Sequence, residues 1–203
     1  KEVIAQIDEV VGAQNICAVK TGALGSAANV KAVAAFLHAQ DLPWVVDPVM
    51  VASRGDAALL DKSALSAMRD ALIPGAALVT ANVPEAEALT GITIKGLEDA
   101  LEAAGMIVAL GARAAMVKGG HMTTKECVDL IVTDDGSVIE LATPRLPISK
   151  LLHGGGCTLS ALITARLARG DSLKTAITWS KRTLLPALED LVDVGGKLRV
   201  IVL

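Results

Sequence analysis

Aromatic residues and runs of like charge are scarce in this sequence. Phe36, Trp44 and Trp179 are its aromatic residues, about 1% of 203 residues, and it contains no tyrosine. Proteins that bind single-stranded nucleic acid stack bases on an aromatic platform, which three scattered rings cannot supply. The 19 basic and 22 acidic residues give a formal charge of −3 and form no long run of either sign. No nucleic-acid partner is therefore predicted.

Long apolar segments and paired cysteines are absent too. No apolar stretch approaches the ~20 residues of a membrane-spanning helix, and the first residues lack the basic and then apolar layout of a signal peptide. Cys17, Cys127 and Cys157 are an odd number without the short spacing of a metal site. We therefore expect no membrane partner and a cytoplasmic location, where thiols stay reduced.

Short apolar runs alternate with helical patterns along most of the chain. Strands are predicted over residues 16–20, 44–47, 76–80 and 114–118. Helices are predicted between them: one capped by Ser26, one capped by Asp61, one from Pro84 to Gly91 and one over residues 97–110. This alternation indicates parallel strands with helices on both faces of the sheet.

The last third of the chain departs from this alternation. Residues 127–133 and 138–142 flank Asp134-Asp135-Gly136, which is a turn signal, so an antiparallel hairpin is predicted at one edge of the sheet. Two further helices are predicted over residues 158–168 and 173–191. The length suits a single domain.

Polar or glycine residues follow all four predicted parallel strands, at residues 20–22, 47–48, 80–82 and 118–120. In open α/β sheets, ligands bind outside the carboxyl ends of the strands. One such end would mean little, but four together predict a single shared site at this edge of the sheet.

The most informative segment is the run Gly154, Gly155 and Gly156, which Cys157 and a helical pattern follow. Three glycines let the backbone point consecutive N–H groups at an anion, and the helix adds its partial positive charge. A phosphate suits such a site; a plain glycine-rich turn into a helix is the alternative. Cys157 falls in the first helical turn, where the dipole is expected to lower its pKa and favour a thiolate base. A small buried cysteine is the competing interpretation.

Two carboxylates follow neighbouring strands. Asp47 ends the second predicted strand, and Glu85 lies in the first turn of the helix that follows Asn82. Mg²⁺ binds through few carboxylates together with waters and substrate phosphates, so this pair suits a Mg²⁺ site. A helix-start acid and a turn aspartate are the structural alternatives. Lys118, which ends the fourth strand, suits contact with a phosphate or nucleotide, although a solvated lysine is common there.

Taken in order, five segments resemble the ribokinase-like vitamin kinases. The resemblance is closest to the hydroxymethylpyrimidine and hydroxymethylpyrimidine-phosphate kinases of thiamin biosynthesis. The segments are Val19 to Ser26, Val46 to Ala52, Thr80 to Leu89, Val117 to His121 and His153 to Ser160. Cysteine at position 157 separates this branch from pyridoxal and sugar kinases, in which aspartate is usual.

The resemblance implies a ribokinase-like three-layer α/β/α fold and ATP-dependent phosphorylation of hydroxymethylpyrimidine and its monophosphate. Cys157 would be the catalytic residue, and the backbone of Gly154, Gly155 and Gly156 would form the anion hole. The other implied roles are ATP binding by Lys118, Asn82 and Lys181, Mg²⁺ binding by Glu85 and Asp47, and pyrimidine binding by Gly22, Ala23 and Val49. Catalysis would rest mainly on positioning and charge stabilisation.

The chain also departs from the family pattern. Family members usually begin with a glycine-rich strand segment, so we expect residues 1–203 to form a single kinase domain without its N-terminal strands. Ala23 replaces a methionine, Gly155 replaces a threonine, and Leu151 and Leu152 replace polar residues. These changes leave open a pyridoxal-type kinase and a degenerate pyrimidine-binding domain without turnover. Related kinases are often dimers, so a homodimer is open as well.

Overall fold

A mostly parallel sheet organises the computed structural model, which describes residues 2–50, 62–122, 125–146, 152–195 and 199–203. The strands follow one another in the order β1-β2-β3-β4-β5-β6. Their bounds are β1 Val19–Thr21, β2 Trp44–Val46, β3 Leu78–Asn82, β4 Ala114–Lys118, β5 Glu126–Thr133 and β6 Val138–Pro144. Strands β1 to β4 are parallel, whereas β5 and β6 form an antiparallel edge hairpin. Both predictions are confirmed.

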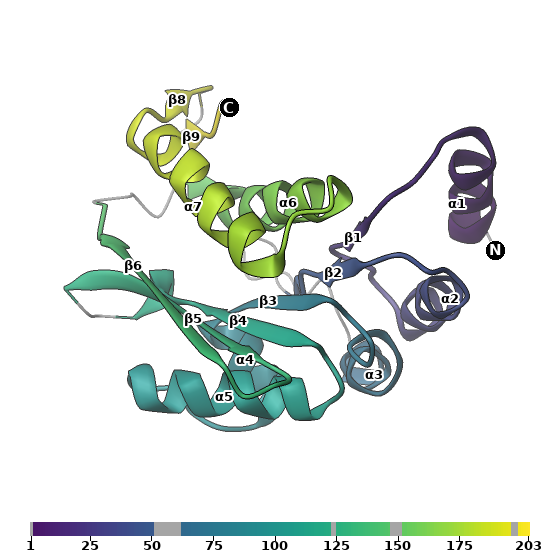
Figure 1. The fold of residues 1–203 in the computed structure, drawn as a ribbon, viewed down its shortest axis with the longest axis horizontal. Coiled ribbons are helices and arrows are strands. Elements are labelled where there is room, and N and C mark those ends of the chain that lie inside the picture. Colours follow the sequence, from purple (N-terminus) through teal and green to yellow (C-terminus); the bar gives the residue numbers. More distant parts are fainter. Residues whose placement is uncertain (1, 51–61, 123–124, 147–151, 196–198) are drawn as a thin grey trace.

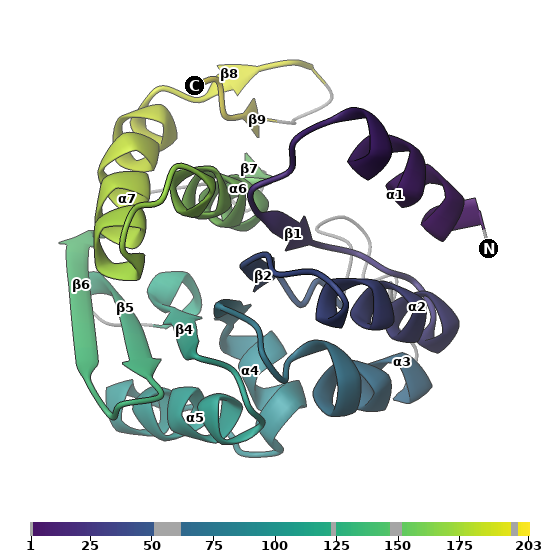
Figure 2. The same cartoon turned by 45° about the vertical axis from the view of Figure 1, so that its right-hand side comes forward.

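Helices cover both faces of this sheet, as the alternating pattern predicts (Figures 1 and 2). On one face lie α2 Ala27–His38, α3 Lys62–Ala67 with the π-helical turn Met68–Leu72, α4 Val83–Thr90 and α5 Leu97–Ala109. On the other face lie α6 Gly155–Ala168 and α7 Leu173–Glu189. The arrangement is the expected three-layer α/β/α sandwich.

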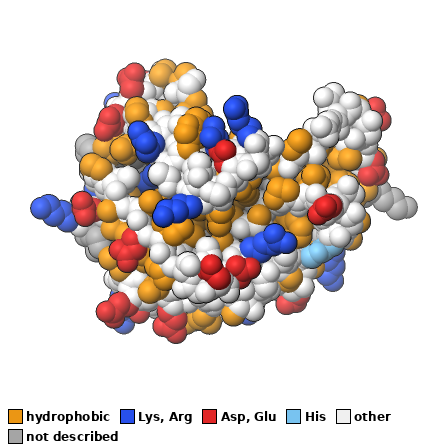
Figure 3. Space-filling model, in the orientation of Figure 1, with side chains coloured by type: hydrophobic (Ala, Val, Ile, Leu, Met, Phe, Trp, Pro, Cys, Tyr) orange, Lys and Arg blue, Asp and Glu red, His pale blue; other side chains and the backbone are white. Residues whose placement is uncertain are grey.

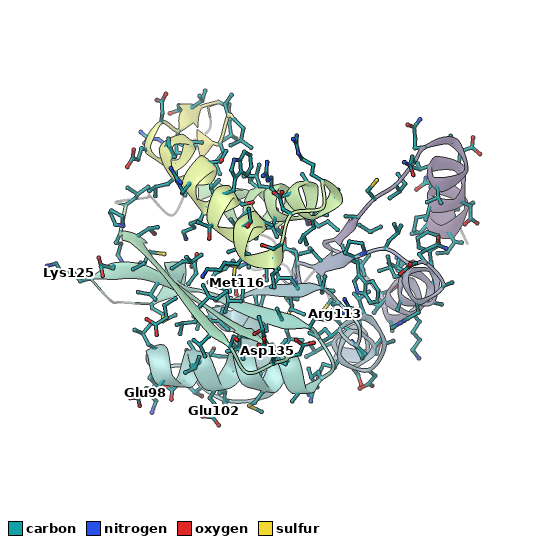
Figure 4. All side chains as sticks on the ribbon, in the orientation of Figure 1. Glu98, Glu102, Arg113, Met116, Lys125 and Asp135 are labelled. Carbon is teal, nitrogen blue, oxygen red and sulfur yellow. The ribbon has the colours of Figure 1, made fainter. Side chains whose placement is uncertain are left out.

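Two apolar cores separate the layers, and β4 contributes to both. Ala115 and Val117 pack in the core beneath α2 to α5, whereas Ala114 and Met116 pack in the core under α6 and α7. Because successive side chains of a strand point to opposite faces, a strand buried on both sides reads as a continuous apolar run. Figure 4 shows Met116 between the sheet and the α6–α7 layer, while Glu98 and Glu102 of α5 point outward.

The structure differs from the sequence predictions mainly at element ends. Helix α6 begins at Gly155 rather than Thr158, because Gly154 adopts a left-handed conformation with a φ of 89° and starts the helix behind it. Strand β1 begins only at Val19, where pairing with Trp44 starts. The expected cap at Asp61, the end of the family-like segment at Val51 and Ala52, and the family difference at Leu151 lie outside the described residues.

Helix α1 and a second, smaller sheet are not predicted by the sequence. Helix α1, Glu2–Ala13, has no fully buried residue, although Val3 and Ile7 pack against the larger core. A second sheet joins β7 Leu152–His153, β9 Arg199–Val200 and β8 Val192–Asp193. Two-residue strands carry too little periodicity for recognition from sequence.

The surface offers few simple clues to function. None of the helices in the described ranges is long and apolar enough to cross a membrane. On the face in Figure 3, acidic and basic side chains are interspersed. The chemistry has to be sought at the carboxyl ends of the strands.

The turn after β4 is held tightly against β5. Gly119 starts a short 3-10 turn, Gly119–His121, and a Cβ added to it would lie 2.1 Å from the carbonyl oxygen of Val128. Only glycine therefore lets the turn approach the β5 backbone this closely. The turn follows directly after Lys118, so this contact also fixes where that lysine leaves the sheet.

We expect Gly119→Ala to destabilise the protein by about 3 kcal/mol, because the backbone of β5 cannot move aside without disturbing the hairpin. Gly120→Ala is the matched control: no atom lies within 4 Å of a Cβ there, and the expected change is about 0.5 kcal/mol. Urea unfolding followed by circular dichroism measures both. Equal stability of the two variants would contradict the close approach.

Candidate functional site

The carboxyl ends of the parallel strands bring together residues from across the chain. Lys20 lies in β1, Asp47 directly follows β2, Asn82 ends β3 and Lys118 ends β4. Asn82 and Lys118 are partners in the β3–β4 register. The shared site that four polar strand ends predict is therefore present as a cluster of side chains.

Asp47 is the centre of this cluster. Its side chain is buried. In the turn after β2, Val49 N donates to the backbone carbonyl oxygen of Asp47 at 2.8 Å. Lys20 Nζ lies 3.5 Å from Oδ2, and Lys118 Nζ lies 3.4 Å from Oδ1. Ser160 Oγ, from α6 on the opposite face, donates to Oδ2 at 3.0 Å. One carboxylate thus joins β1, β2, β4 and α6.

The charge state of Asp47 follows from these partners. Burial by itself raises the pKa of the carboxyl, but Lys118 and Lys20, with hydrogen bonds from Cys157 and Ser160, outweigh it and hold the pKa below its ordinary value. Asp47 therefore stays ionised at neutral pH, and its pairing stabilises the fold above the unfolded-state pKa. That contribution is lost as the pH falls through the folded-state pKa.

Glu85 faces the same cation from the start of α4. Asn82 and Glu85 form a capping box: Glu85 N donates to Asn82 Oδ1 at 2.9 Å, and Asn82 N donates to Glu85 Oε2 at 2.8 Å. Lys118 Nζ lies 3.8 Å from Oε2. Burial raises the pKa of Glu85 above its ordinary value, although Lys118 and the Asn82 backbone oppose the shift. Asp47 and Glu85 thus converge on one ammonium group.

The start of α6 completes the cluster with backbone donors. The first hydrogen bond of this helix runs from Thr158 N to Gly154 O at 2.8 Å, so the helix offers no acceptor to the N–H groups of Gly155, Gly156 and Cys157. A Cβ at Gly156 would lie 3.2 Å from Lys118 Nζ. The predicted anion site and the predicted phosphate-binding lysine are therefore adjacent, and a side chain at position 156 would displace the end of that lysine.

Cys157 lies in the first turn of α6 and is accessible to solvent. The expectation of a lowered thiol pKa is not met. Partial desolvation, followed by the charge and hydrogen bond of Asp47, raises the pKa of Cys157 above its ordinary value, and Lys20 and Lys118 only partly oppose this. The helix dipole by itself favours a thiolate, but the carboxylate of Asp47, directly after β2, acts in the opposite direction, and with its raised pKa Cys157 is protonated at neutral pH.

Lys181 lies apart from this cluster, on α7. It pairs with the buried Asp129 of β5 and lines a cavity of about 290 Å³. Leucines of α7 form much of the apolar wall, and Arg145, which donates to the carbonyl oxygens of Gly119 and Gly120 at 3.2 and 3.1 Å, also lines the cavity. The cavity therefore borders the turn that follows Lys118.

The residues predicted to bind the pyrimidine are less well gathered. A Cβ at Gly22 would lie 3.5 Å from Lys20 Nζ, which places Gly22 beside the cluster. Val49 is tied to it through Asp47, whereas Ala23 is exposed and in the described part of the chain no polar contact joins it to the site. The sequence places Lys20 at one of the four polar strand ends but gives it no individual role, and it gives no role to Ser160 or Asp129.

Known proteins resemble this chain in sequence and in overall fold. A profile of the phosphomethylpyrimidine kinase family matches residues 1–201. The chain belongs to this family. It is 42% identical over 191 residues to a thiamine biosynthesis bifunctional protein of Geobacter sulfurreducens, covering 94% of this chain and 38% of that protein. It is 38% identical to the hydroxymethylpyrimidine/phosphomethylpyrimidine kinase of Haemophilus influenzae, covering 96% of this chain and 73% of that kinase.

Solved structures extend the likeness to the fold. An ADP complex of Bacillus subtilis pyridoxal kinase has a TM-score of 0.88 and 28% identity, covering 98% of this chain and 74% of that one. The predicted ribokinase-like fold and the assignment to a phosphotransferase family of thiamin biosynthesis are confirmed. In this family member, the cluster at the carboxyl ends of the strands includes Cys157, Lys118, Asn82 and Glu85.

We expect Ser160→Ala to lower the free energy of unfolding by about 1–3 kcal/mol, because Asp47 loses a buried hydrogen bond to its charged oxygen. Thr158→Ala is a control in the same helix, since the Thr158 hydroxyl makes no hydrogen bond within the described residues. Guanidinium unfolding at neutral pH compares them. A Ser160 variant as stable as the control would show that the Ser160–Asp47 bond does not hold α6 to the sheet.

The pH at which alkylation of Cys157 reaches half its maximal rate is expected to lie above the ordinary thiol pKa of about 8.5. Asp47→Asn should lower that pH, because the variant removes a charge that raises the pKa of Cys157. Iodoacetamide labelling read by peptide mass spectrometry measures the rate, with the exposed Cys17 in the same chain as reagent control. Circular dichroism verifies folding. An unchanged midpoint in Asp47→Asn would overturn the assignment of Asp47 as a cause.

Proposed function

We propose that this protein transfers the γ-phosphoryl group of ATP to hydroxymethylpyrimidine and then to its monophosphate. The observation that carries the proposal is the meeting of the free N–H groups of α6, Lys118 and Cys157 at one end of the sheet. Phosphoryl transfer needs backbone donors and cations fixed around the transferred group and little other chemistry from the protein. Family membership supports the same reaction.

The nucleotide would occupy the cavity beside Lys181, with its phosphates directed to Lys118. Leucines of α7 line this cavity. They would pack against the nucleotide base by apolar contact, since the chain has few aromatic residues for stacking. A Cβ added at Gly156 would lie 3.2 Å from Lys118 Nζ, so the lysine and the glycine backbone of α6 are near enough to contact one phosphoryl group. Asn82 would act by holding Glu85 through the capping box.

The two carboxylates fit a Mg²⁺ ion that ATP brings with it. The described residues contain no group of three or more His, Cys, Asp or Glu able to hold a metal by themselves. Asp47 and Glu85 nevertheless converge on Lys118 Nζ, and Mg²⁺ in kinases typically uses one or two carboxylates, phosphate oxygens and waters. Bound there, the ion would supply charge neutralisation.

Cys157 would orient the substrate hydroxyl rather than ionise in advance. The raised pKa keeps the thiol protonated, which suits a loose transition state in which the attacking hydroxyl needs little prior activation. The N–H groups of Gly155 and Gly156 would stabilise charge on the transferred group. Gly22, Ala23 and Val49 would contact the pyrimidine.

We expect the purified protein with Mg-ATP to form ADP when hydroxymethylpyrimidine is added and to form less with pyridoxal. Cys157→Ala should lower kcat by about 10²- to 10⁴-fold, while Cys17→Ala, at an exposed thiol with no role in the proposed reaction, should leave it unchanged. A coupled ADP assay measures both.

Three results would change the proposal. Greater turnover of pyridoxal would favour the pyridoxal-type kinase, whose structure this chain resembles. Pyrimidine binding without ADP release would favour a degenerate binding domain. Full activity of Cys157→Ala would remove the catalytic assignment and leave the reaction class in place.

A further inference from the structure

Asp129 is a buried acidic residue that the proposed reaction does not use directly. It lies on β5, one residue beyond Val128, and its side chain is 1% exposed. A carboxylate buried to this extent needs partners for both oxygens. Its two partners come from different parts of the proposed nucleotide site.

The first partner is the turn that follows the phosphate-binding lysine. Gly119 N donates to Asp129 Oδ1 at 2.8 Å. Gly119 is already pressed against the Val128 backbone, so packing and this hydrogen bond hold the turn at the same place. Because Lys118 is the neighbouring residue in the chain, the position of its backbone is set there as well.

The second partner is the lysine at the cavity. Lys181 Nζ pairs with Asp129 Oδ2, and the lysine side chain remains 14% exposed. An ammonium group has three donors, so this pairing leaves donors that can turn toward the cavity it lines. Without a partner, the flexible four-carbon stem of a lysine takes up several conformations.

We propose that Asp129 is a positioning residue for nucleotide binding: its two oxygens hold Lys181 at the cavity wall and the Gly119 turn at the phosphate centre, and so fix the distance between the two. This inference rests on the proposed kinase function, because it assumes that ATP spans the cavity and Lys118. Asp129 contacts neither the transferred group nor Cys157 in this arrangement, so its role is in affinity for ATP.

Asp129→Asn separates the two halves of this role. The amide oxygen can still accept from Gly119 N, but the amide nitrogen cannot accept from Lys181. We expect the dissociation constant for ATP, measured by isothermal titration calorimetry, to rise about 3- to 10-fold, as for a side chain that must be ordered on binding. The KM for ATP should rise in parallel, with kcat and the KM for the pyrimidine within about twofold of wild type.

Two controls keep a structural effect apart from a positioning effect. Glu140→Gln removes an exposed carboxylate from the neighbouring strand β6 and should leave ATP affinity unchanged. Lys181→Met should weaken ATP binding. Adding Asp129→Asn to that variant should weaken binding no further, because both substitutions remove the same Lys181–Asp129 interaction. Thermal unfolding confirms that each variant is folded at the assay temperature.

The outcomes distinguish the inference from the function on which it rests. Unchanged ATP affinity in Asp129→Asn, additive effects of the two variants, or a loss of kcat at constant KM would each overturn the positioning role while wild type still binds ATP. Absence of ATP binding by the wild-type protein would instead overturn the proposed function, and this inference with it.

Discussion

The need to neutralise one buried carboxylate organises the whole site. Asp47 has 1% of its surface exposed, and an unpaired charge at such a position would be strongly destabilising. Its partners come from β1, β4 and α6, so satisfying Asp47 also brings Lys20, Lys118 and the start of α6 together. Two cations and the backbone donors of α6 are therefore held in place by the fold itself, which is the preorganisation that the proposed phosphoryl transfer requires.

The same carboxylate changes the chemistry of its neighbours. A helix start favours a thiolate when it acts alone, but partial desolvation and Asp47 raise the pKa of Cys157 above its ordinary value. Burial raises the pKa of Glu85, which is held in its capping box. At Asp47 burial also raises the pKa, but Lys118 and Lys20 outweigh it and lower the pKa below its ordinary value. The two carboxyl groups that face one ammonium group thus have pKa values shifted in opposite directions. Their surroundings, and not their residue type, decide which of them loses its proton more easily.

Much of the fold could be predicted from sequence, because its signals are local. The Asp134-Asp135-Gly136 turn predicts the hairpin, and the apolar run of β4 predicts a strand that is buried on both faces. The candidate site was only partly predictable. Asp47 and Glu85 were recognised as converging acids, but Ser160 is an ordinary helical serine in sequence, and Asp129 is one acid within a hairpin strand. Their partners lie 113 and 52 residues away, beyond the reach of any local pattern.

The sequence by itself determined the alternation of strands and helices, the strand ends that carry polar residues, and the glycines that open α6. Periodicity, turn residues and glycine conformations act over a few neighbouring residues, and these features follow from them. Only the tertiary structure decided which charges pair. Sheet order sets Lys118 between Asp47 and Glu85, and the α6–α7 layer sets Ser160 on Asp47 and Lys181 on Asp129. Burial then forces each charge to find its partner, and the partner decides what that side chain can do.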